Sequence, residues 1–413
     1  MKLGLIGKPL GHSWSPEIHT FITKQNYSLF ELDEDKMHQF LHQKNFDGLN
    51  VTIPYKQKVM EDLYEIDPLA KEIGAVNCIV NDNGRLEGHN TDIDGFIGML
   101  KHNHIDVRGK KAAVLGSGGA SKAAVCALKH MDAYPYVISR TKRTDTYTYD
   151  ELYGHESEFQ IIVNATPVGM KPDYDDVPVD LKRFTHLEAV VDIIANPLRT
   201  RLQFDAKMLG IPYCGGFEML VRQAFAADEL FTHQKLDDKL VPECMKAVLK
   251  KRRNIVLIGM PTSGKSTIAA ILGKRTGAAA VEMDEAIEKE IGMSIPECFK
   301  TKGEVYFRNV EKQIARKHRE AAGEILSCGG GVIKNPDTMR YLSENGLVIW
   351  IDRGLKHLFP TDSRPLAGSE QALQNLYQER LPLYQKYSDI HIDNSGNIEN
   401  TVREILSKTG WEA

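Results

Sequence analysis

The chain has 413 residues, more than one hydrophobic core ordinarily serves, so two or three domains are expected. Hydrophobic residues make up 42% of it and charged residues 26%, as is typical of globular proteins in water. The formal net charge of −4 argues against a nucleic-acid-binding protein, and no apolar run approaches the roughly 18 residues that a membrane-spanning helix needs.

The start of the chain and its cysteines indicate the compartment. Met1 and Lys2 lead directly into an apolar run at 3–6, without the apolar core of a secretory leader. The six cysteines are scattered and form no C-x-x-C pair, which favours reduced thiols over a metal or redox role. We therefore expect a cytoplasmic protein that binds neither membrane nor nucleic acid.

Apolar runs alternate with amphipathic stretches along the chain, which indicates an α/β fold. The first strands are predicted at 3–6, 48–53 and 75–80. Asn83-Gly84 then predicts a hairpin, because both central residues of such a turn need positive φ. A connecting helix is predicted at 94–104.

A glycine-rich loop, GSGGAS, follows the next predicted strand, at 110–115. Gly116 permits the tight turn and Gly118 lets a pyrophosphate approach the backbone, while Ser121 begins a helix, predicted at 121–129, whose N-terminus would receive the phosphates. Because Ser121 replaces the third glycine of G-x-G-x-x-G, a turn without a cofactor is the alternative. The dinucleotide contacts expected from this loop are Gly116, Gly118, Gly119, Ala120 and Ser121.

The end of the second strand of this unit, predicted at 136–139, selects the dinucleotide. A site for NAD would place an acidic residue there, but the run 139–143 reads SRTKR. A 2′-phosphate needs hydrogen-bond donors and positive charge, so Arg140 and Thr141 favour NADP, with a solvated loop as the alternative. Two further buried strands are predicted at 160–164 and 189–193.

Six short motifs lie around this loop. They read GKPLGHSWSP at 7–16, NVTIPYK at 50–56, GAVN at 74–77, GHNTDIDG at 88–95, NATPVGM at 164–170 and MLVRQ at 219–223. In this order and spacing they closely resemble shikimate dehydrogenase over residues 1–250.

The resemblance implies a role for each matching residue. Lys56 and Asp92 would be the catalytic pair, since hydride delivery to a ketone creates an alkoxide that must gain a proton. Met219 would line the NADP site. The substrate would be held by hydroxyl and amide side chains, namely Ser13, Ser15, Thr52, Asn77, Asn90 and Gln223.

Two features depart from this family. Its D-x-x-Y segment usually contributes a tyrosine that contacts substrate, whereas here Asp192 is followed three residues later by Ala195. A lost hydroxyl contact costs about 1–3 kcal/mol, so weaker substrate binding is expected. The stretch 140–164 is also short, which trims the periphery of the nucleotide-binding fold.

A second phosphate-binding loop follows a helix predicted from Pro242, a domain junction at 251–254 and a strand at 254–258. It reads GMPTSGKST, the G-x-x-x-x-G-K-[ST] pattern, and leads into a helix predicted at 266–275. In such a loop Lys265 reaches the β- and γ-phosphates and Ser266 supplies a hydroxyl to Mg²⁺. The ATP contacts expected here are Gly259, Met260, Pro261, Thr262, Ser263, Gly264, Lys265, Ser266 and Thr267.

The motifs after this loop resemble shikimate kinase across 254–413. They read VEMD at 281–284, FRNVE at 307–311, GGG at 329–331, RPL at 364–366 and RLPLY at 380–384. The resemblance implies that Asp284 accepts the proton of the attacking hydroxyl and that Arg364 lies on a lid over ATP. Glu282, in place of the family's first Asp, would join Ser266 at Mg²⁺, and the lid at 358–364 is short. Shikimate would be gripped by Asp284, Arg308, Gly329, Gly330, Gly331 and Arg380, whose two guanidinium groups suit a carboxylate.

Together these patterns predict an α/β chain of two enzymes. Residues 1–95 with 217–251 would form a substrate-binding subdomain, 96–216 a Rossmann NADP subdomain, and 253–413 a P-loop kinase domain. The first enzyme would use NADPH to reduce 3-dehydroshikimate, and the second would use MgATP to phosphorylate the hydroxyl so formed. A binding or regulatory protein with one degenerate site and an NAD-using quinate/shikimate dehydrogenase fused to a kinase are the alternatives.

Overall fold

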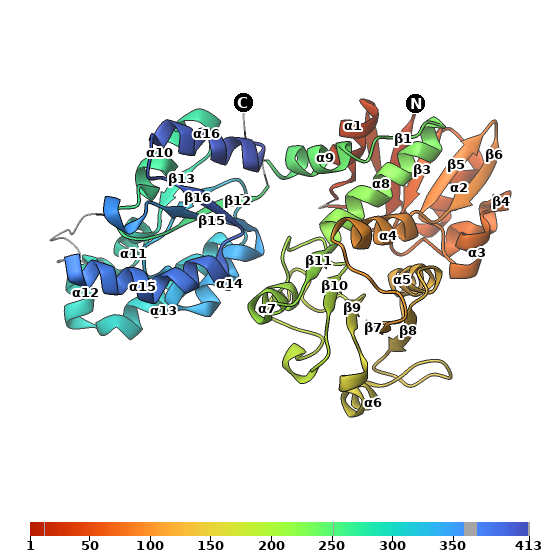
Figure 1. Cartoon of the computed structure of the whole chain (residues 1–413). Coiled ribbons are helices and arrows are strands. Elements are labelled where there is room, and N and C mark those ends of the chain that lie inside the picture. Colours follow the sequence, from red (N-terminus) through yellow and green to blue (C-terminus); the bar gives the residue numbers. More distant parts are fainter. Residues whose placement is uncertain (12, 251, 359–369, 412–413) are drawn as a thin grey trace. The chain divides into compact units, whose positions relative to one another are not determined.

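The computed structural model describes residues 1–11, 13–250, 252–358 and 370–411. The chain divides into two compact units, Met1–Val248 and Leu249–Ala413 (Figure 1). Among the described residues, every helix is too short or too polar to cross a membrane.

The first sheet of the first unit is mixed, with strand order β2-β1-β3-β5-β6-β4. Its strands are β1 (Leu3–Gly7), β2 (Tyr27–Glu31), β3 (Gly48–Val51), β4 (Glu65–Ile66), β5 (Cys78–Asp82) and β6 (Arg85–His89), and its helices are α1 (Ser15–Thr23), α2 (Glu34–Gln43) and α3 (Pro68–Ile73). Successive residues of β1 face opposite layers, because side chains alternate along a strand. Leu5 packs in a cluster with Phe231, while Ile6 packs with Met37 and Leu41 of α2.

The predicted hairpin between β5 and β6 is confirmed. Asn83 and Gly84 have φ values of 49° and 87°, and the two strands pair antiparallel from Cys78↔His89 to Asp82↔Arg85. This turn fixes the register that places the segment after β6 beside the segment before β5.

The second sheet of this unit is parallel, with strand order β11-β10-β9-β7-β8. Its strands are β7 (Lys111–Leu115), β8 (Tyr134–Ile138), β9 (Ile161–Asn164), β10 (Ala189–Asp192) and β11 (Tyr213–Gly215), and its helices are α5 (Gly119–His130), α6 (Tyr149–Gly154) and α7 (Arg201–Leu209). In chain order this is the doubly wound arrangement 2-1-3-4-5, whose ligand crevice lies where the connections change direction, beside its first strand. Pro135 is tolerated in β8 because that strand lies at the edge of the sheet.

Three further helices complete the first unit, α4 (Asp92–His102), α8 (Gly216–Thr232) and α9 (Leu240–Leu249). Helices α4 and α8 pack closely against each other (Figure 1). A Cβ atom at Gly95 would lie 2.6 Å from the carbonyl oxygen of Met219, so only glycine permits this approach. The close packing sets the start of α4 beside α8, which positions the first site.

The second unit contains a parallel sheet with strand order β13-β14-β12-β15-β16. Its strands are β12 (Asn254–Ile258), β13 (Ala280–Glu282), β14 (Ile325–Ser327), β15 (Gly346–Asp352) and β16 (Ile390–Asp393), and its helices are α10 (Lys265–Thr276), α11 (Met283–Ile291), α12 (Ile295–Thr301), α13 (Gly303–His318), α14 (Pro336–Glu344), α15 (Glu370–Tyr387) and α16 (Ile398–Thr409). Strands β13, β14 and β12 end side by side, so the loops that follow them meet at one edge of the sheet.

Several predicted boundaries differ from the structure by two or three residues. The helix predicted at 94–104 is Asp92–His102, because the carboxylate of Asp92 already lies in its first turn. The strand predicted at 75–80 is Cys78–Asp82, since Val76 and Asn77 donate their N–H groups to Lys56 and His89 instead. The α/β class and its parallel sheets are confirmed.

Candidate active sites

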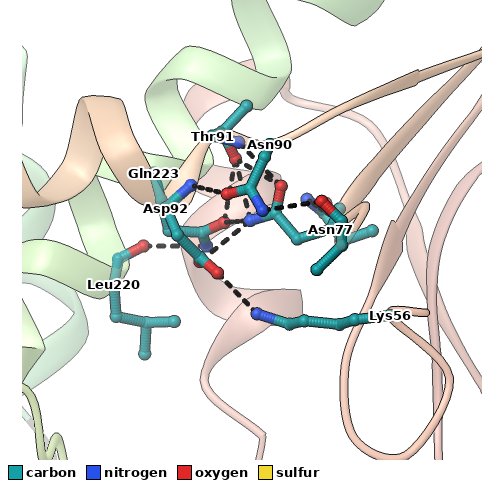
Figure 2. Close-up of polar contacts among 9 residues, drawn as sticks. Lys56, Asn77, Asn90, Thr91, Asp92, Leu220 and Gln223 are labelled. Atoms are coloured by element: carbon teal, nitrogen blue, oxygen red, sulfur yellow. Dashed lines mark hydrogen bonds and ion pairs between the residues drawn. The ribbon is translucent and has the colours of Figure 1, made fainter. Parts of the chain in front are cut away.

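The first site is built around an ion pair between Lys56 and Asp92. The Nζ atom of Lys56 lies 2.6 Å from Oδ2 of Asp92, and the two side chains are 21% and 12% exposed (Figure 2). Lys56 follows β3, whereas Asp92 is the first residue of α4, where the helix dipole stabilises a negative charge. The pair therefore presents a cation, held by a fixed carboxylate, at a site that is open to a small molecule.

Asn77 and Thr91 hold the Asp92 carboxylate in place. The Nδ2 group of Asn77 donates to Oδ1 of Asp92 at 2.9 Å, and its Oδ1 accepts from the backbone N–H of Thr91 at 2.7 Å (Figure 2). Both residues are 2% exposed. Each carboxylate oxygen of Asp92 thus has its own donor, one from Lys56 and one from Asn77. Thr91 lies in the motif at 88–95, but a threonine before an aspartate carries no signal that identifies this role.

Gln223 of α8 joins this network, whereas Asn90 supports its backbone. The Oε1 atom of Gln223 lies 3.3 Å from both Nδ2 of Asn77 and Oγ1 of Thr91. Asn90 donates to the carbonyl of Ala75 at 2.8 Å and accepts from the N–H of Asp92 at 3.2 Å. Asn90 therefore shapes the turn before α4 through bonds to main-chain groups.

The predicted hydroxyl groups lie beyond the carboxyl ends of β1 and β3, which are neighbouring parallel strands. Ser13 accepts a hydrogen bond from the N–H of Ser15 at 3.2 Å, and Ser15 begins α1. The N–H of Thr52 donates to the carbonyl of Ile6 at 2.9 Å, four residues before Lys56. The sheet thus delivers all three hydroxyl residues to the edge from which the Lys56 loop also leaves.

The first glycine loop follows β7, at the crevice of the second sheet. Gly116 has a φ of 105°, in the region that favours glycine, and its carbonyl accepts a hydrogen bond from Oγ of Ser121 at 2.7 Å. Helix α5 begins at Gly119, two residues earlier than predicted, and none of the described side chains caps its N-terminus. A Cβ atom on Gly118 or Gly119 would meet nothing within 4 Å. The uncapped helix start, with the open space beside Gly118 and Gly119, fits a dinucleotide pyrophosphate.

The residues after β8 carry the predicted selectivity for a 2′-phosphate. Arg140 and Thr141 are exposed, and no ion pair involves Arg140 within the described part of the chain. Lys142 is instead paired with Glu151 at 2.7 Å. Met219 is 7% exposed and belongs to the hydrophobic core between α4, α5 and the second sheet. Arg140 and Arg143 are therefore the two guanidinium groups of this run for which the described residues provide no ion pair.

The second glycine loop, after β12, wraps around its own lysine. Lys265 is 6% exposed, and its ammonium group donates to the carbonyls of Gly259 at 3.0 Å and Met260 at 2.8 Å. Gly264, with a φ of 97°, ends the loop, and Lys265 begins α10, which also carries Ser266 and Thr267. The loop is held from outside by Asn394, whose amide donates to the carbonyl of Ser263 at 2.8 Å.

The loop begins with few glycines, and one of its other residues adopts a backbone conformation that usually favours glycine. Thr262 adopts a φ of 64°, and its hydroxyl donates to the carbonyl of Pro261 at 2.6 Å. A β-branched residue is strained in the left-handed region, so this turn is held by the rest of the loop rather than by its own preference.

A set of oxygen ligands lies next to the loop. Oγ of Ser266 donates to a carboxylate oxygen of Glu282 at 3.0 Å and lies 3.4 Å from Oγ of Ser327. Hydroxyl and carboxylate oxygens are the ligands that Mg²⁺ prefers. The longer side chain of Glu282 reaches Ser266, so the donor set fits Mg²⁺ despite the departure from the family pattern.

The triple glycine after β14 brings together the three predicted substrate residues. A Cβ atom on Gly329 would lie 2.6 Å from Oδ1 of Asp284, and one on Gly330 would lie 3.2 Å from Nη1 of Arg380. A Cβ atom on Gly331 would collide with the guanidinium of Arg308. A side chain at Gly329 or Gly331 would displace Asp284 or Arg308 from its present position, and one at Gly330 would press on Pro261 as well as on Arg380.

Arg308 and Arg380 are each fixed by further contacts. Nη1 of Arg308 donates to Glu311 at 2.8 Å, and burial raises the pKa of the Glu311 carboxyl. Nη1 of Arg380 and the hydroxyl of Tyr384 both donate to the carbonyl of Gly330, at 2.8 and 2.6 Å. The i+3 spacing of Glu311 from Arg308 signals their contact in a helix, whereas the bond from Tyr384 to Gly330 joins distant segments and has no such signal in the sequence. Arg364 lies outside the described residues.

Family models match both units. The model described as shikimate dehydrogenase substrate binding domain matches residues 5–79, and the model described as shikimate kinase matches 261–409.

Curated relatives match the first unit. A shikimate dehydrogenase (NADP(+)) of Clostridium beijerinckii is 40% identical over 255 residues, covering 57% of this chain and 94% of the relative. Among solved structures, a chorismate mutase/shikimate 5-dehydrogenase fusion protein from Clostridium acetobutylicum has a TM-score of 0.57 at 36% identity and covers 60% of this chain and 96% of that one. A Thermus thermophilus shikimate 5-dehydrogenase in complex with NADP(H) and shikimate has a TM-score of 0.56 at 30% identity and covers 60% of this chain and all of that one.

Proposed function

The first unit of the chain belongs to the shikimate dehydrogenase family and the second to the shikimate kinase family, and from this we propose that one chain catalyses both reactions in sequence. The first reaction reduces the ketone of 3-dehydroshikimate to give shikimate. The second phosphorylates that same hydroxyl and yields shikimate 3-phosphate. The product of one site is therefore the substrate of the other.

In the dehydrogenase, Lys56 donates a proton to the reduced oxygen. NADPH, when bound at the Gly116–Ser121 loop, supplies the hydride. The ammonium group of Lys56 stabilises the developing alkoxide and protonates it, while Asp92 holds the lysine at 2.6 Å. By resemblance to the family, Ser13 and Ser15 would bind the carboxylate, and Thr52, Asn77, Asn90 and Gln223 would contact the ring hydroxyls.

Selectivity for NADPH rests on Arg140, with Thr141 beside it. Lys142 is neutralised by Glu151, so Arg140 supplies the charge that a 2′-phosphate requires. An NAD-using enzyme would instead carry a carboxylate at this strand end.

In the kinase, Asp284 orients the attacking hydroxyl and accepts its proton. MgATP, when bound at the Gly259–Thr267 loop, supplies the phosphoryl group, with Ser266 and Glu282 at the metal. Arg308 and Arg380 grip the carboxylate of shikimate across the glycine turn. The observation that carries this assignment is that Asp284, Arg308 and Arg380 each face one glycine of the same turn.

The protein has no disulfide among its six cysteines, all of which are buried as free thiols. Reduced thiols suit the cytoplasm, where both nucleotides are available, and we place the activity there.

A single-pot assay with 3-dehydroshikimate, NADPH and MgATP tests the proposal on the full chain. We expect shikimate 3-phosphate, identified by mass spectrometry, only when both nucleotides are present. NADPH oxidation that stops at shikimate would show a defective kinase and would direct attention to Glu282. Phosphorylation of added shikimate without NADPH oxidation would show a defective dehydrogenase, the outcome to which Ala195 could contribute. Binding of substrates without any turnover would support the alternative of a binding protein.

A further inference from the structure

Three potential metal ligands lie together outside both proposed active sites. They are Glu72, Cys126 and His130, and one ligand atom from each lies within 4.8 Å of the other two. Cys126 and His130 are one turn apart on α5, whereas Glu72 comes from the last turn of α3. Helices α3 and α5 are in contact and lie side by side (Figure 1). Ile73, next to Glu72, shares a core cluster with Cys126, which anchors this contact.

The spacing of two of the ligand atoms suits a tetrahedral zinc site. Sγ of Cys126 lies 3.6 Å from Nδ1 of His130. With a Zn–S bond of about 2.3 Å and a Zn–N bond of about 2.0–2.1 Å, tetrahedral ligands are separated by about 3.6 Å. Glu72 is exposed, so its carboxylate can rotate to complete a third vertex.

The chemistry of the three ligands also favours a cation. Nδ1 of His130 lies 2.9 Å from the carbonyl of Cys126, and a metal ion would replace that hydrogen bond with a ligand bond. A thiolate, an imidazole and a carboxylate together select a borderline-soft divalent ion over Mg²⁺ or Ca²⁺.

We propose that Glu72, Cys126 and His130 form a binding site for Zn²⁺ or a similar thiophilic divalent cation, with the fourth position open to water. Helix α3 belongs to the layer of the first sheet, and α5 starts at the first glycine loop of the second sheet. A bound ion therefore cross-links the two parts of the dehydrogenase at the far end of the helix that begins at the dinucleotide loop. This site is separate from Lys56 and Asp92 and is independent of the proposed reactions.

Cobalt binding to the purified full chain tests this proposal directly. Titration with Co²⁺ should produce a thiolate-to-cobalt charge-transfer band in the near ultraviolet, which Zn²⁺ then abolishes by displacement. His130→Ala and Glu72→Gln alter exposed side chains, and each should weaken binding by about tenfold or more. Cys126→Ser should remove the band. Matched controls are His186→Ala, which removes another exposed histidine, and Cys244→Ser, which removes another buried thiol; both should leave the band intact.

Each outcome decides the proposal. A Zn²⁺-dependent rise in the melting temperature of the wild type that His130→Ala abolishes would support the site by linkage. Absence of the band in the wild type, or an unchanged band in His130→Ala and Glu72→Gln, would overturn it. If Cys126→Ser fails to fold, these two exposed variants decide the question alone.

Discussion

Substitution of Asp92 by Asn tests how the dehydrogenase positions its lysine. The carboxylate of Asp92 accepts from Lys56 at 2.6 Å and from Asn77 at 2.9 Å, so both of its oxygens serve as acceptors. An asparagine has only one acceptor and must turn an N–H₂ group toward one of these two donors. In Asp92→Asn one charge-assisted hydrogen bond is therefore lost, and the new amide N–H₂ group points at the N–H group of Lys56 or Asn77, which is also a donor.

The magnitude follows from the lost hydrogen bond. A hydrogen bond to a charged group contributes about 1.5–3 kcal/mol. Because each 1.36 kcal/mol is a factor of ten in rate, kcat/KM for 3-dehydroshikimate should fall by about 10- to 200-fold. The decrease should be in kcat as well as in KM, since Lys56 acts on the developing alkoxide rather than only on bound substrate.

The assay follows NADPH oxidation, with kinase turnover on added shikimate measured in the same sample. Asp94→Asn is the matched control, because it removes the same charge from the first turn of α4 without touching Lys56. We expect Asp94→Asn to retain dehydrogenase activity and both variants to retain kinase activity. Equal losses in Asp92→Asn and Asp94→Asn would refute the role of the ion pair, and so would an unchanged kcat/KM in Asp92→Asn.

Four further predictions concern single residues. Arg140→Ala should raise KM for NADPH by about tenfold or more while leaving KM for NADH unchanged in steady-state assays, because only NADPH carries the 2′-phosphate. Glu282→Ala should raise the Mg²⁺ concentration for half-maximal kinase activity by about tenfold, which a metal titration at saturating ATP measures. Thr262→Gly should raise the free energy of unfolding of the kinase unit by about 1 kcal/mol in denaturant titrations, since glycine relieves the strained φ of 64°. Burial raises the pKa of Asp192 from 3.8 to about 6, so the folded state binds this proton more tightly than the unfolded chain does. The free energy of unfolding of the dehydrogenase unit should therefore fall by about 2 kcal/mol as pH rises from 4 to 7, and Asp192→Asn should remove that dependence.

The sequence was sufficient where function depends on local geometry. The hairpin at Asn83-Gly84 and the strand-loop-helix units around both glycine loops follow from turn chemistry and periodicity, and the structure contains all three. The phosphate-binding residues of these loops can be assigned from the sequence, because the geometry of each turn fixes their spacing along the chain. The same reasoning reaches Glu311 only in retrospect, through its helical spacing from Arg308.

Contacts between distant segments could not be predicted in this way. Thr91 contacts Gln223 across 132 positions of the chain, and Asn394 supports the carbonyl of Ser263 across 131. Thr91 lies in the motif at 88–95 and Asn394 lies in none, but each acts through a buried hydrogen bond that exists only once the fold is formed. The helix boundary at Asp92 shows the same limit, because the first turn of α4 is fixed by Asn77 and Asn90 from outside the helix.

Each site draws its described side chains from one unit alone. Lys56, Asp92 and Gln223 belong to Met1–Val248, whereas Lys265, Asp284 and Arg380 belong to Leu249–Ala413. The hydrophobic cores follow the same division, since the cluster around Ile255 and Leu257 contains only residues of the second unit. Substitutions without shared contacts have additive effects. A substitution at the dehydrogenase site should therefore leave the kinase activity unchanged, and a substitution at the kinase site should leave the dehydrogenase activity unchanged. For this reason the kinase rate in Asp92→Asn measures only the amount of intact second unit in the sample. Retained NADPH oxidation in Asp94→Asn is the control for folding of the first unit, and with it the loss in Asp92→Asn can be assigned to the ion pair.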